Sequence, residues 1–230
     1  NLSSKLRMSW AGKFINMASM SLSFLTIYLI ISFLRIMILA STLVLILAGI
    51  QSYSINLCQH LQLSIVLNQI NLLVSNIKSN GAANVIAINK ALSNKRESKK
   101  LYLYPSKNLG RHSLLDINSD DFIDVQTLTL DRFLESEKID FSRIKLAKID
   151  IEGYELFALL GAKRVLKNLR CLICEFEPKL MIKGGVAPDE LISLLEDADF
   201  NANLIHDGRL VTAERESIFA HAPCDIIWTK

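Results

Sequence analysis

The feature that most constrains the fold is an unbroken succession of strand, turn, helix and strand in the second half of the chain. Residues Ile144–Ile151 (IKLAKIDI) have the apolar content of a buried strand, and a glycine-containing turn follows directly. The next residues favour a helix over Tyr154–Ala162 and another over Lys163–Asn168, and Cys171–Phe176 (CLICEF) is typical of a second buried strand. Two strands joined through helices form a β-α-β unit, so the sequence predicts a parallel strand pair with a right-handed crossover.

Strand and helix patterns also alternate outside this unit. Such alternation predicts an α/β fold around a mainly parallel, doubly wound sheet. Upstream we expect a helix over 71–80, strands over 84–88, 101–104 and 124–130, and a turn over 132–135 that Asp131 caps. Downstream we expect a helix that starts at Pro188 and closing strands over 204–205, 210–211 and 225–228.

The first part of the chain has a different composition. Residues 21–50 are almost wholly apolar and contain one charged residue, Arg35, whereas charged residues return at an ordinary density further on. About 20 apolar residues suffice to cross a bilayer, so this stretch has the length of a membrane-spanning helix, with the basic residues near the N-terminus on the inner side. We therefore divide the chain into an apolar N-terminal segment, 1–70, and an α/β domain, 71–230.

Charge and cysteine content limit the class of partner and the cellular compartment. The net charge is +3, and basic residues are scattered among acidic ones, so the sequence has no basic stripe for nucleic acid and we expect a small-molecule partner. The four cysteines lack the spacing of a disulfide framework, and Cys171-x-x-Cys174 has no second pair with which to bind a metal. These features favour free thiols, core packing of that pair, and a cytoplasmic protein or one anchored to the membrane through residues 21–50.

Two acidic residues follow the first strand of the β-α-β unit. In open α/β sheets, ligands bind beyond the carboxyl ends of the strands, which is where Asp150 and Glu152 lie in the sequence. Because they are two apart, we expect them to point to the same side of an extended strand, and Gly153 allows a tight turn into the next helix. An alternative interpretation is that these acids only cap that helix and pair with Lys148 or Lys145 at the surface.

Several segments of the domain resemble one known family. They are, in chain order, NLLVSNIKSNG with NVIAINKALS, NLGRHSLL, VQTLTLDRFL, KLAKIDIEGYELFALLGAKRVL, CLICEFEP and CDIIWTK, and they cover 71–230 almost continuously. In order and content they are similar to the FkbM family of S-adenosylmethionine-dependent methyltransferases. The resemblance implies an enzyme with a Rossmann-like class I methyltransferase sheet, bound S-adenosylmethionine, and methyl transfer to an oxygen atom of a sugar or small natural product.

The resemblance also implies catalytic roles for the acidic residues. Asp150 would lie beside the cofactor, where it would act as a base or orient the acceptor, and Glu152 and Glu175 are second choices. For Glu175, an ion pair at the end of its strand is the stronger alternative.

Three further residues are candidates for ligand binding. Asn89 and Ala91 correspond to contacts with adenine, although a plain turn fits them equally well. His112 would help to bind the substrate, although a lone loop histidine is more often solvated. No metal ligand set is expected.

The cofactor half of such a domain is missing from the sequence as written. A domain of this kind should open with an acidic, glycine-rich turn such as D-x-G-A-N-x-G, followed at a distance by a second acid that binds the ribose. Neither motif is present, and residues 50–71 contain no Asp or Glu.

Two interpretations explain this absence. The first, which we favour, is a shifted reading frame: suitable codons for Thr42–Ala48, read one base earlier, encode D-I-G-A-N-I-G, and those for Val66–Gln69 encode F-E-P in the same frame. The second is a genuine membrane helix around 21–50. Three functions follow as alternatives: a methyltransferase whose written chain is damaged on its cofactor side, a membrane-anchored protein with a truncated, non-catalytic α/β binding domain, and a product without function.

Overall fold

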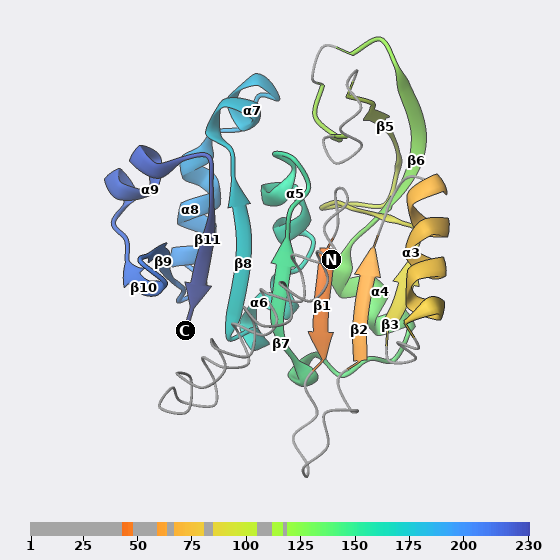
Figure 1. Ribbon diagram of the computed structural model, residues 1–230, viewed down its shortest axis with the longest axis horizontal. Coiled ribbons are helices and arrows are strands. Elements are labelled where there is room, and N and C mark those ends of the chain that lie inside the picture. Colours follow the sequence, from red (N-terminus) through yellow and green to blue (C-terminus); the bar gives the residue numbers. More distant parts are fainter. Residues whose placement is uncertain (1–42, 48–58, 64–66, 81–84, 105–111, 117–118) are drawn as a thin grey trace, which may run out of the picture. The chain divides into compact units, whose positions relative to one another are not determined.

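The predicted succession of strand, helix and strand is present in the computed structural model (Figure 1). Every residue of the first strand except Lys145 is buried, and so is every residue of the second except Glu175, which explains why both sequences are nearly continuous apolar runs. The strands pair in parallel, which confirms the β-α-β unit, but the first strand ends before the expected Ile151. The four elements are β7 (Ile144–Ile149), α5 (Glu155–Leu160), α6 (Lys163–Asn168) and β8 (Cys171–Phe176).

An eight-stranded sheet surrounds this pair, in the order β10-β9-β11-β8-β7-β1-β2-β3. The predicted strands over 84–88, 204–205, 210–211 and 225–228 are confirmed within it. The remaining strands are β1 (Leu43–Leu47), β2 (Gln59–Leu63), β3 (Val85–Ile88), β9 (Asn201–His206), β10 (Arg209–Thr212) and β11 (Cys224–Thr229). The structure describes residues 43–47, 59–63, 67–80, 85–104, 112–116 and 119–230, all of which belong to one unit, Ala40–Lys230.

The direction of strand pairing differs from the predicted, mainly parallel sheet. Strand β7 is parallel to β8, and β2 is parallel to β3. Strand β1 is antiparallel to both β2 and β7, and the pairs β8–β11, β11–β9 and β9–β10 are antiparallel as well. The sheet is therefore mixed, because a hydrophobic period identifies a strand without indicating the direction of its neighbour.

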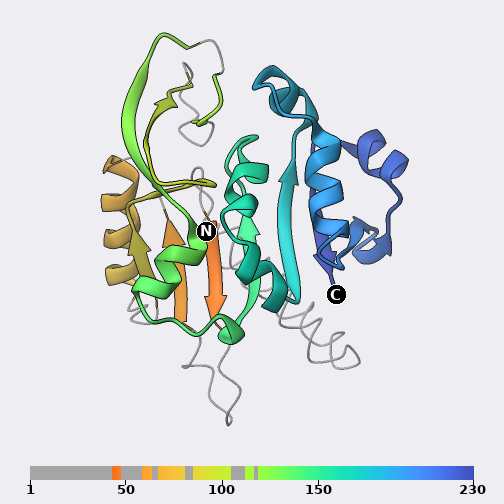
Figure 2. The same ribbon diagram turned by 180° about the vertical axis from the view of Figure 1, so that it is seen from behind.

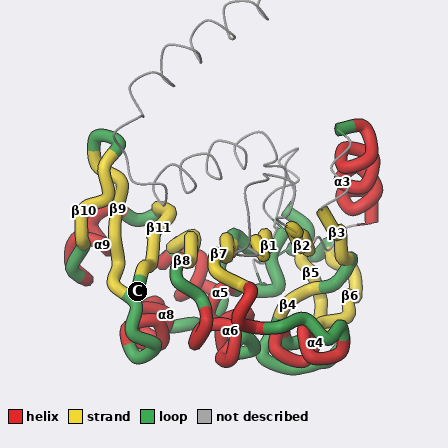
Figure 3. Tube along the Cα trace, turned by 90° about the horizontal axis from the view of Figure 1, so that it is seen from below, coloured by secondary structure: helices red, strands yellow, loops and turns green. Residues whose placement is uncertain are grey.

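The described helices cover the two faces of the sheet unequally. Helices α5, α6, α8 (Pro188–Glu196) and α4 (Leu130–Ser136) lie along one face, whereas α3 (Leu67–Ser79) lies on the other side, next to β3 (Figures 2 and 3). The fold is thus mixed α/β, and its described helices do not give a clear double winding. The short helices are α7 (Pro178–Lys183), α9 (Arg215–His221) and the 3-10 helix η3 (Phe141–Arg143).

A three-stranded sheet accompanies the large one. Its strands are β4 (Ala91–Leu92), β5 (Ser98–Tyr102) and β6 (Phe122–Leu128), in the order β4-β6-β5. Strands β5 and β6 are antiparallel, and β4 is parallel to β6. The strands expected over 101–104 and 124–130 are found here, but both are shifted toward the N-terminus.

Asp131 does not cap its own turn as predicted. It lies in the first turn of α4, whose N-cap is Thr129. Its carboxylate instead accepts backbone hydrogen bonds from Arg164 and Val165, at 2.9 and 3.2 Å, and so caps the start of α6. The Arg164 side chain also pairs with Glu135 of α4, so two helices that are distant in sequence are joined by their side chains.

The core lies between the central strands and helices α5, α6 and α8. Trp228 on β11 and Tyr154 before α5 are among its largest fully buried side chains. Trp228 is opposite Leu172 of β8, and its indole N–H has no hydrogen-bond partner in the part of the chain that the structure describes. Cys171 and Cys174 are buried free thiols, which confirms that this pair packs in the core.

Within the described parts of the chain, every helix is too short or too polar to span a bilayer. Most of the apolar stretch 21–50 lies outside the described residues, and its described part is strand β1. The segments 42–48 and 66–69 also lie partly outside them, so the shifted reading frame stays a prediction.

Candidate functional site

The turn after β7 carries the two acidic residues identified in the sequence. Asp150 follows the last residue of the strand, and Glu152 adopts a left-handed backbone with a φ of 57°, followed by Gly153 with a φ of 92°. The prediction that both acids lie on an extended strand is therefore wrong, because they lie in a turn. A left-handed backbone is unfavourable for a residue with a side chain, so neighbouring groups must hold this turn.

Glu155 holds the turn in place. Its Oε1 accepts hydrogen bonds from the backbone N–H groups of Ile151 and Gly153, at 3.0 and 3.2 Å. The side chain is completely buried, and Oε2 has no hydrogen-bond partner among the described residues. Burial raises the pKa of Glu155 to about 7, although the backbone hydrogen bonds oppose this rise. Near neutral pH, this carboxyl group is therefore divided between its charged and neutral forms.

The carboxyl groups of Asp150, Glu152 and Glu175, here called the acidic cluster, meet at one place. Their oxygen atoms lie within 4.8 Å of one another. Glu175 lies near the end of β8, so the carboxyl ends of two adjacent parallel strands supply the cluster. Burial, together with the charge of Asp150 and other nearby acids, raises the pKa of Glu175 to about 9. Glu175 is therefore neutral at pH 7, which removes one of the three like charges.

Lys148 supplies a positive charge to the acidic cluster. Its Nζ lies 2.6 Å from Asp150 Oδ2 and 3.9 Å from Asp225 Oδ1. Burial by itself favours the neutral amine, but the two aspartates outweigh it and raise the pKa of Lys148. The predicted alternative, an ion pair between Asp150 and Lys148, is thus present, but the lysine is buried and does not lie at the surface. The cluster has the oxygen ligands that a divalent cation prefers, but because Lys148 provides a positive charge, the arrangement does not by itself indicate a metal.

The ion pair suggested for Glu175 is not seen among the described residues. Its Oε2 is buried and has no hydrogen-bond partner there. A neutral carboxyl group is consistent with this environment, because a buried carboxylate without a partner is strongly unfavourable.

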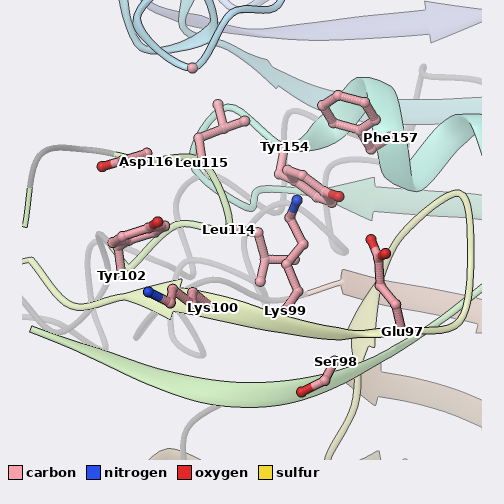
Figure 4. A pocket seen from close by; sticks show the side chains of 11 residues that line it. Glu97, Ser98, Lys99, Lys100, Tyr102, Leu114, Leu115, Asp116, Tyr154 and Phe157 are labelled. Carbon is pink, nitrogen blue, oxygen red and sulfur yellow. The ribbon is translucent and has the colours of Figure 1, made fainter.

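A cavity of about 420 Å³, here called the β5 pocket, lies between β5 and the start of α5 (Figure 4). Lys99 and Tyr154 point toward one another across it. The described lining consists of 97–100, Tyr102, 114–116, Tyr154, Phe157 and Gly184.

The β5 pocket adjoins the turn that carries the acidic cluster. A side chain at Gly153 would place its Cβ 3.0 Å from Leu115 Cδ1, and one at Gly184 would place it 2.5 Å from the same atom. Leu115 lines the pocket, so the two glycines allow the backbone to pack directly against its wall. Ser113 strengthens this connection, since its Oγ donates a hydrogen bond to the carbonyl oxygen of Glu152 at 2.7 Å.

The residues with predicted roles in ligand binding lie elsewhere. Asn89 is exposed after β3, and Ala91 is completely buried in β4. His112 is also buried, so the alternative interpretation of a solvated loop histidine is wrong. Its Nδ1 accepts a hydrogen bond from the backbone N–H of Tyr104 at 3.0 Å, and burial lowers its pKa. The acidic cluster and the described lining of the β5 pocket do not include these residues, whose binding roles stay predictions.

Sequence reasoning assigned no role to Glu155, Tyr154 or Ser113. Tyr154 lines the β5 pocket, and its hydroxyl oxygen lies 3.0 Å from Ser93 Oγ. A signal existed for Glu155, because an acid in the first turn of a helix can accept hydrogen bonds from nearby backbone N–H groups. Ser113 carries no such signal, since it meets Glu152 only after folding.

Comparison with known proteins identifies a family that this chain resembles. The sequence model of the family described as Methyltransferase FkbM domain matches residues 51–202, which is more than half of the chain. The match begins before residue 71, and the expected boundary of the domain stays a prediction.

Among solved structures, the chain is similar to one described as the crystal structure of Methyltransferase FkbM from Methylobacillus flagellatus KT. The TM-score is 0.41 and the identity 13%, over 73% of this chain and 35% of that chain. The chain thus spans about a third of that protein's length. No curated protein matches it significantly.

Proposed function

This chain belongs to the family of FkbM methyltransferase domains, and we propose that it transfers a methyl group from S-adenosylmethionine to an oxygen atom of a small-molecule or saccharide acceptor. The acidic cluster at the carboxyl ends of β7 and β8 is the observation that carries the proposal. The parallel pair and its helical crossover support a Rossmann-like class I methyltransferase sheet as the finer description of the fold.

The residues present fit the cofactor in part. When bound, S-adenosylmethionine supplies an electrophilic methyl group on a positively charged sulfonium. The carboxylates of Asp150 and Glu152 suit a neighbouring positive charge, and by resemblance Asn89 and Ala91 would contact the adenine. The glycine-rich turn and the ribose-binding acid are absent from the sequence as written, so the fit concerns the acceptor side of the site.

Asp150 is the residue best placed to act on the acceptor hydroxyl. Lys148 engages Oδ2 of Asp150 and orients the carboxylate, which leaves Oδ1 to accept a hydrogen bond from that hydroxyl and then its proton. Glu175 is neutral at pH 7 and so can donate a hydrogen bond, which would orient a lone pair of the acceptor oxygen. Glu152 is the second choice for the base.

The variant Asp150→Asn tests this assignment. Methyl transfer by the frame-corrected protein is measured with isotope-labelled S-adenosylmethionine and a panel of hydroxylated acceptors, and cofactor binding is measured by calorimetry. We expect kcat to fall by about a hundredfold while cofactor affinity is retained. The matched control is Asp120→Asn, at an exposed position, which should keep full activity. Full activity of Asp150→Asn would remove Asp150 from the mechanism.

A second candidate function is that of a non-catalytic α/β binding domain, and the missing glycine-rich turn favours it. Calorimetry of the frame-corrected protein with S-adenosylmethionine separates the two candidates, because the binding domain should not bind this cofactor. The coding DNA is the simplest further observation. If codons 42–48 read one base earlier encode D-I-G-A-N-I-G, the frame-corrected protein should bind the cofactor; any other sequence there excludes the shifted frame.

We expect the protein to act in the cytoplasm and to have no nucleic-acid partner. Cys171 and Cys174 are free and buried, so they need no oxidising compartment. The small net charge of +3 gives no basis for binding a polyanion. Cell fractionation measures the location, and recovery in the membrane fraction would favour the anchored alternative.

A further inference from the structure

Two lysines stand in the wall of the β5 pocket without an ion-pair partner among the described residues. Lys99 Nζ lies 5.3 Å from the centre of the Tyr154 ring, and Lys100 Nζ lies 3.8 Å from the centre of the Phe122 ring. An aromatic ring face attracts a cation but does not neutralise its charge. Lys99 therefore faces the pocket without a carboxylate partner among the described residues, whereas Lys100, the next residue of the strand, points to the other face of β5.

One acid of the same wall already has a basic partner. Glu97 pairs with Lys95, with 3.1 Å between Oε2 and Nζ. Lysine is a frequent ligand of phosphate and carboxylate groups, to which it donates charge-assisted hydrogen bonds. The pocket thus has the charge of a site for a small anion.

Aromatic side chains give the pocket a second means of recognition. The rings of Tyr154 and Phe157 lie 4.7 Å apart, and the hydroxyl group of Tyr154 is held by Ser93 at 3.0 Å. Tyr102 lines the pocket as well (Figure 4). Tyr154 itself is buried, but the partly exposed rings of Tyr102 and Phe157 beside polar groups suit a ring-shaped organic molecule.

We propose that the β5 pocket binds the anionic end of the methyl acceptor, a phosphate or carboxylate carried by a ring-shaped molecule such as a saccharide. Leu115 is the link between the two sites, because it lines the pocket and packs against Gly153 in the turn of the acidic cluster. Lys99 holds the anion, and a hydroxyl group of the same molecule faces Asp150. This inference rests on the proposed function, since it names the class of acceptor for that site.

Binding of simple sugars to the full chain tests the proposal without the cofactor. The probes are glucose 6-phosphate, glucuronate and glucose, and calorimetry or protein NMR gives their dissociation constants. We expect at least one anionic probe to bind about tenfold more tightly than glucose, as one charge-assisted hydrogen bond predicts. The stronger of the two anions identifies the group, phosphate or carboxylate. Equal binding of all three probes, or none, overturns the proposal.

Matched variants locate the binding to the pocket. Lys99→Gln should lose the preference for the anion, Lys99→Arg should keep most of it, and Lys163→Gln, at an exposed position of α6, should change nothing. Thermal unfolding checks that each variant is folded. An unchanged preference in Lys99→Gln, or an equal loss in Lys163→Gln, contradicts a site at Lys99.

A parallel measurement with S-adenosylmethionine distinguishes this inference from the proposed function. Binding of the anion without binding of the cofactor, in the frame-corrected as well as the written chain, would contradict methyl transfer and leave an anion site. Binding of the cofactor without binding of the anion would contradict only the pocket.

Discussion

The acidic cluster and the β5 pocket differ in how the chain assembles them. Asp150 and Glu152 lie in one short stretch, and Glu175 reaches them through the parallel pair of a single β-α-β unit. The pocket instead takes its walls from separate stretches around β5, Leu115, α5 and Gly184. A site held by local contacts depends on few interactions, whereas an assembled site depends on the packing of every part. We therefore expect the two sites to respond differently to the same disturbance.

The largest effect is expected for Glu155→Ala, which removes the support of the acidic cluster. The backbone N–H groups of Ile151 and Gly153 would be buried without an acceptor, so the free energy of unfolding should fall by about 3 kcal/mol. Urea denaturation followed by circular dichroism measures this loss. Glu155→Gln keeps a carbonyl acceptor and should lose about 1 kcal/mol. Equal losses in both variants would show that these hydrogen bonds do not hold the turn.

Gly161→Ala should disturb the β5 pocket. A Cβ at this position would lie 2.1 Å from the carbonyl oxygen of Ser93, whose side chain holds Tyr154. We expect a loss of about 2 kcal/mol in the free energy of unfolding, together with weaker binding of the anionic probe. Gly208→Ala is the control, because its φ of 75° is strained but its surroundings are open, and it should cost about 1 kcal/mol. Gly161 has a φ of −87°, so its cost is one of contact alone; no loss of stability in Gly161→Ala would show that the Ser93 backbone moves aside.

The smallest of these effects should be the change in the free energy of unfolding per pH unit. It arises from two carboxyl groups at the acidic cluster and its supporting turn. The pKa of Glu155 is raised to about 7 and that of Glu175 to about 9, so the folded protein binds these protons more tightly than the unfolded chain does. Their contribution is complete below a pH of about 4.5 and is lost as the pH rises through the two folded-state values, by about 1 kcal/mol per pH unit for each carboxyl group.

Urea denaturation over this range of pH measures the loss. Glu175→Gln should remove the decline between a pH of about 7 and about 9, and it should roughly halve the slope between about 4.5 and about 7. If wild type and variant have the same profile, Glu175 does not hold a proton in the folded state.

The same comparison shows how far the sequence alone could predict this molecule. The β-α-β unit and Asp150 were predictable, because strand period, turn glycine and helix follow one another directly. The antiparallel neighbours of β7 and β8 were not, because periodicity carries no pairing direction. Asp131 could be recognised as a cap, but its target, α6, is set by tertiary packing. The β5 pocket was not predictable, because Lys99 and Tyr154 are far apart in the sequence and face one another only in the folded chain.

The burial of Trp228 has an optical consequence. Its indole is fully buried and has no hydrogen-bond partner among the described residues, so its fluorescence should be emitted at short wavelength and move to longer wavelength when water enters. Trp228 belongs neither to the acidic cluster nor to the described lining of the β5 pocket. In a Trp10→Phe variant, Trp228 emission therefore reports whether the sheet is folded. It distinguishes a variant that no longer binds a ligand from one that no longer folds.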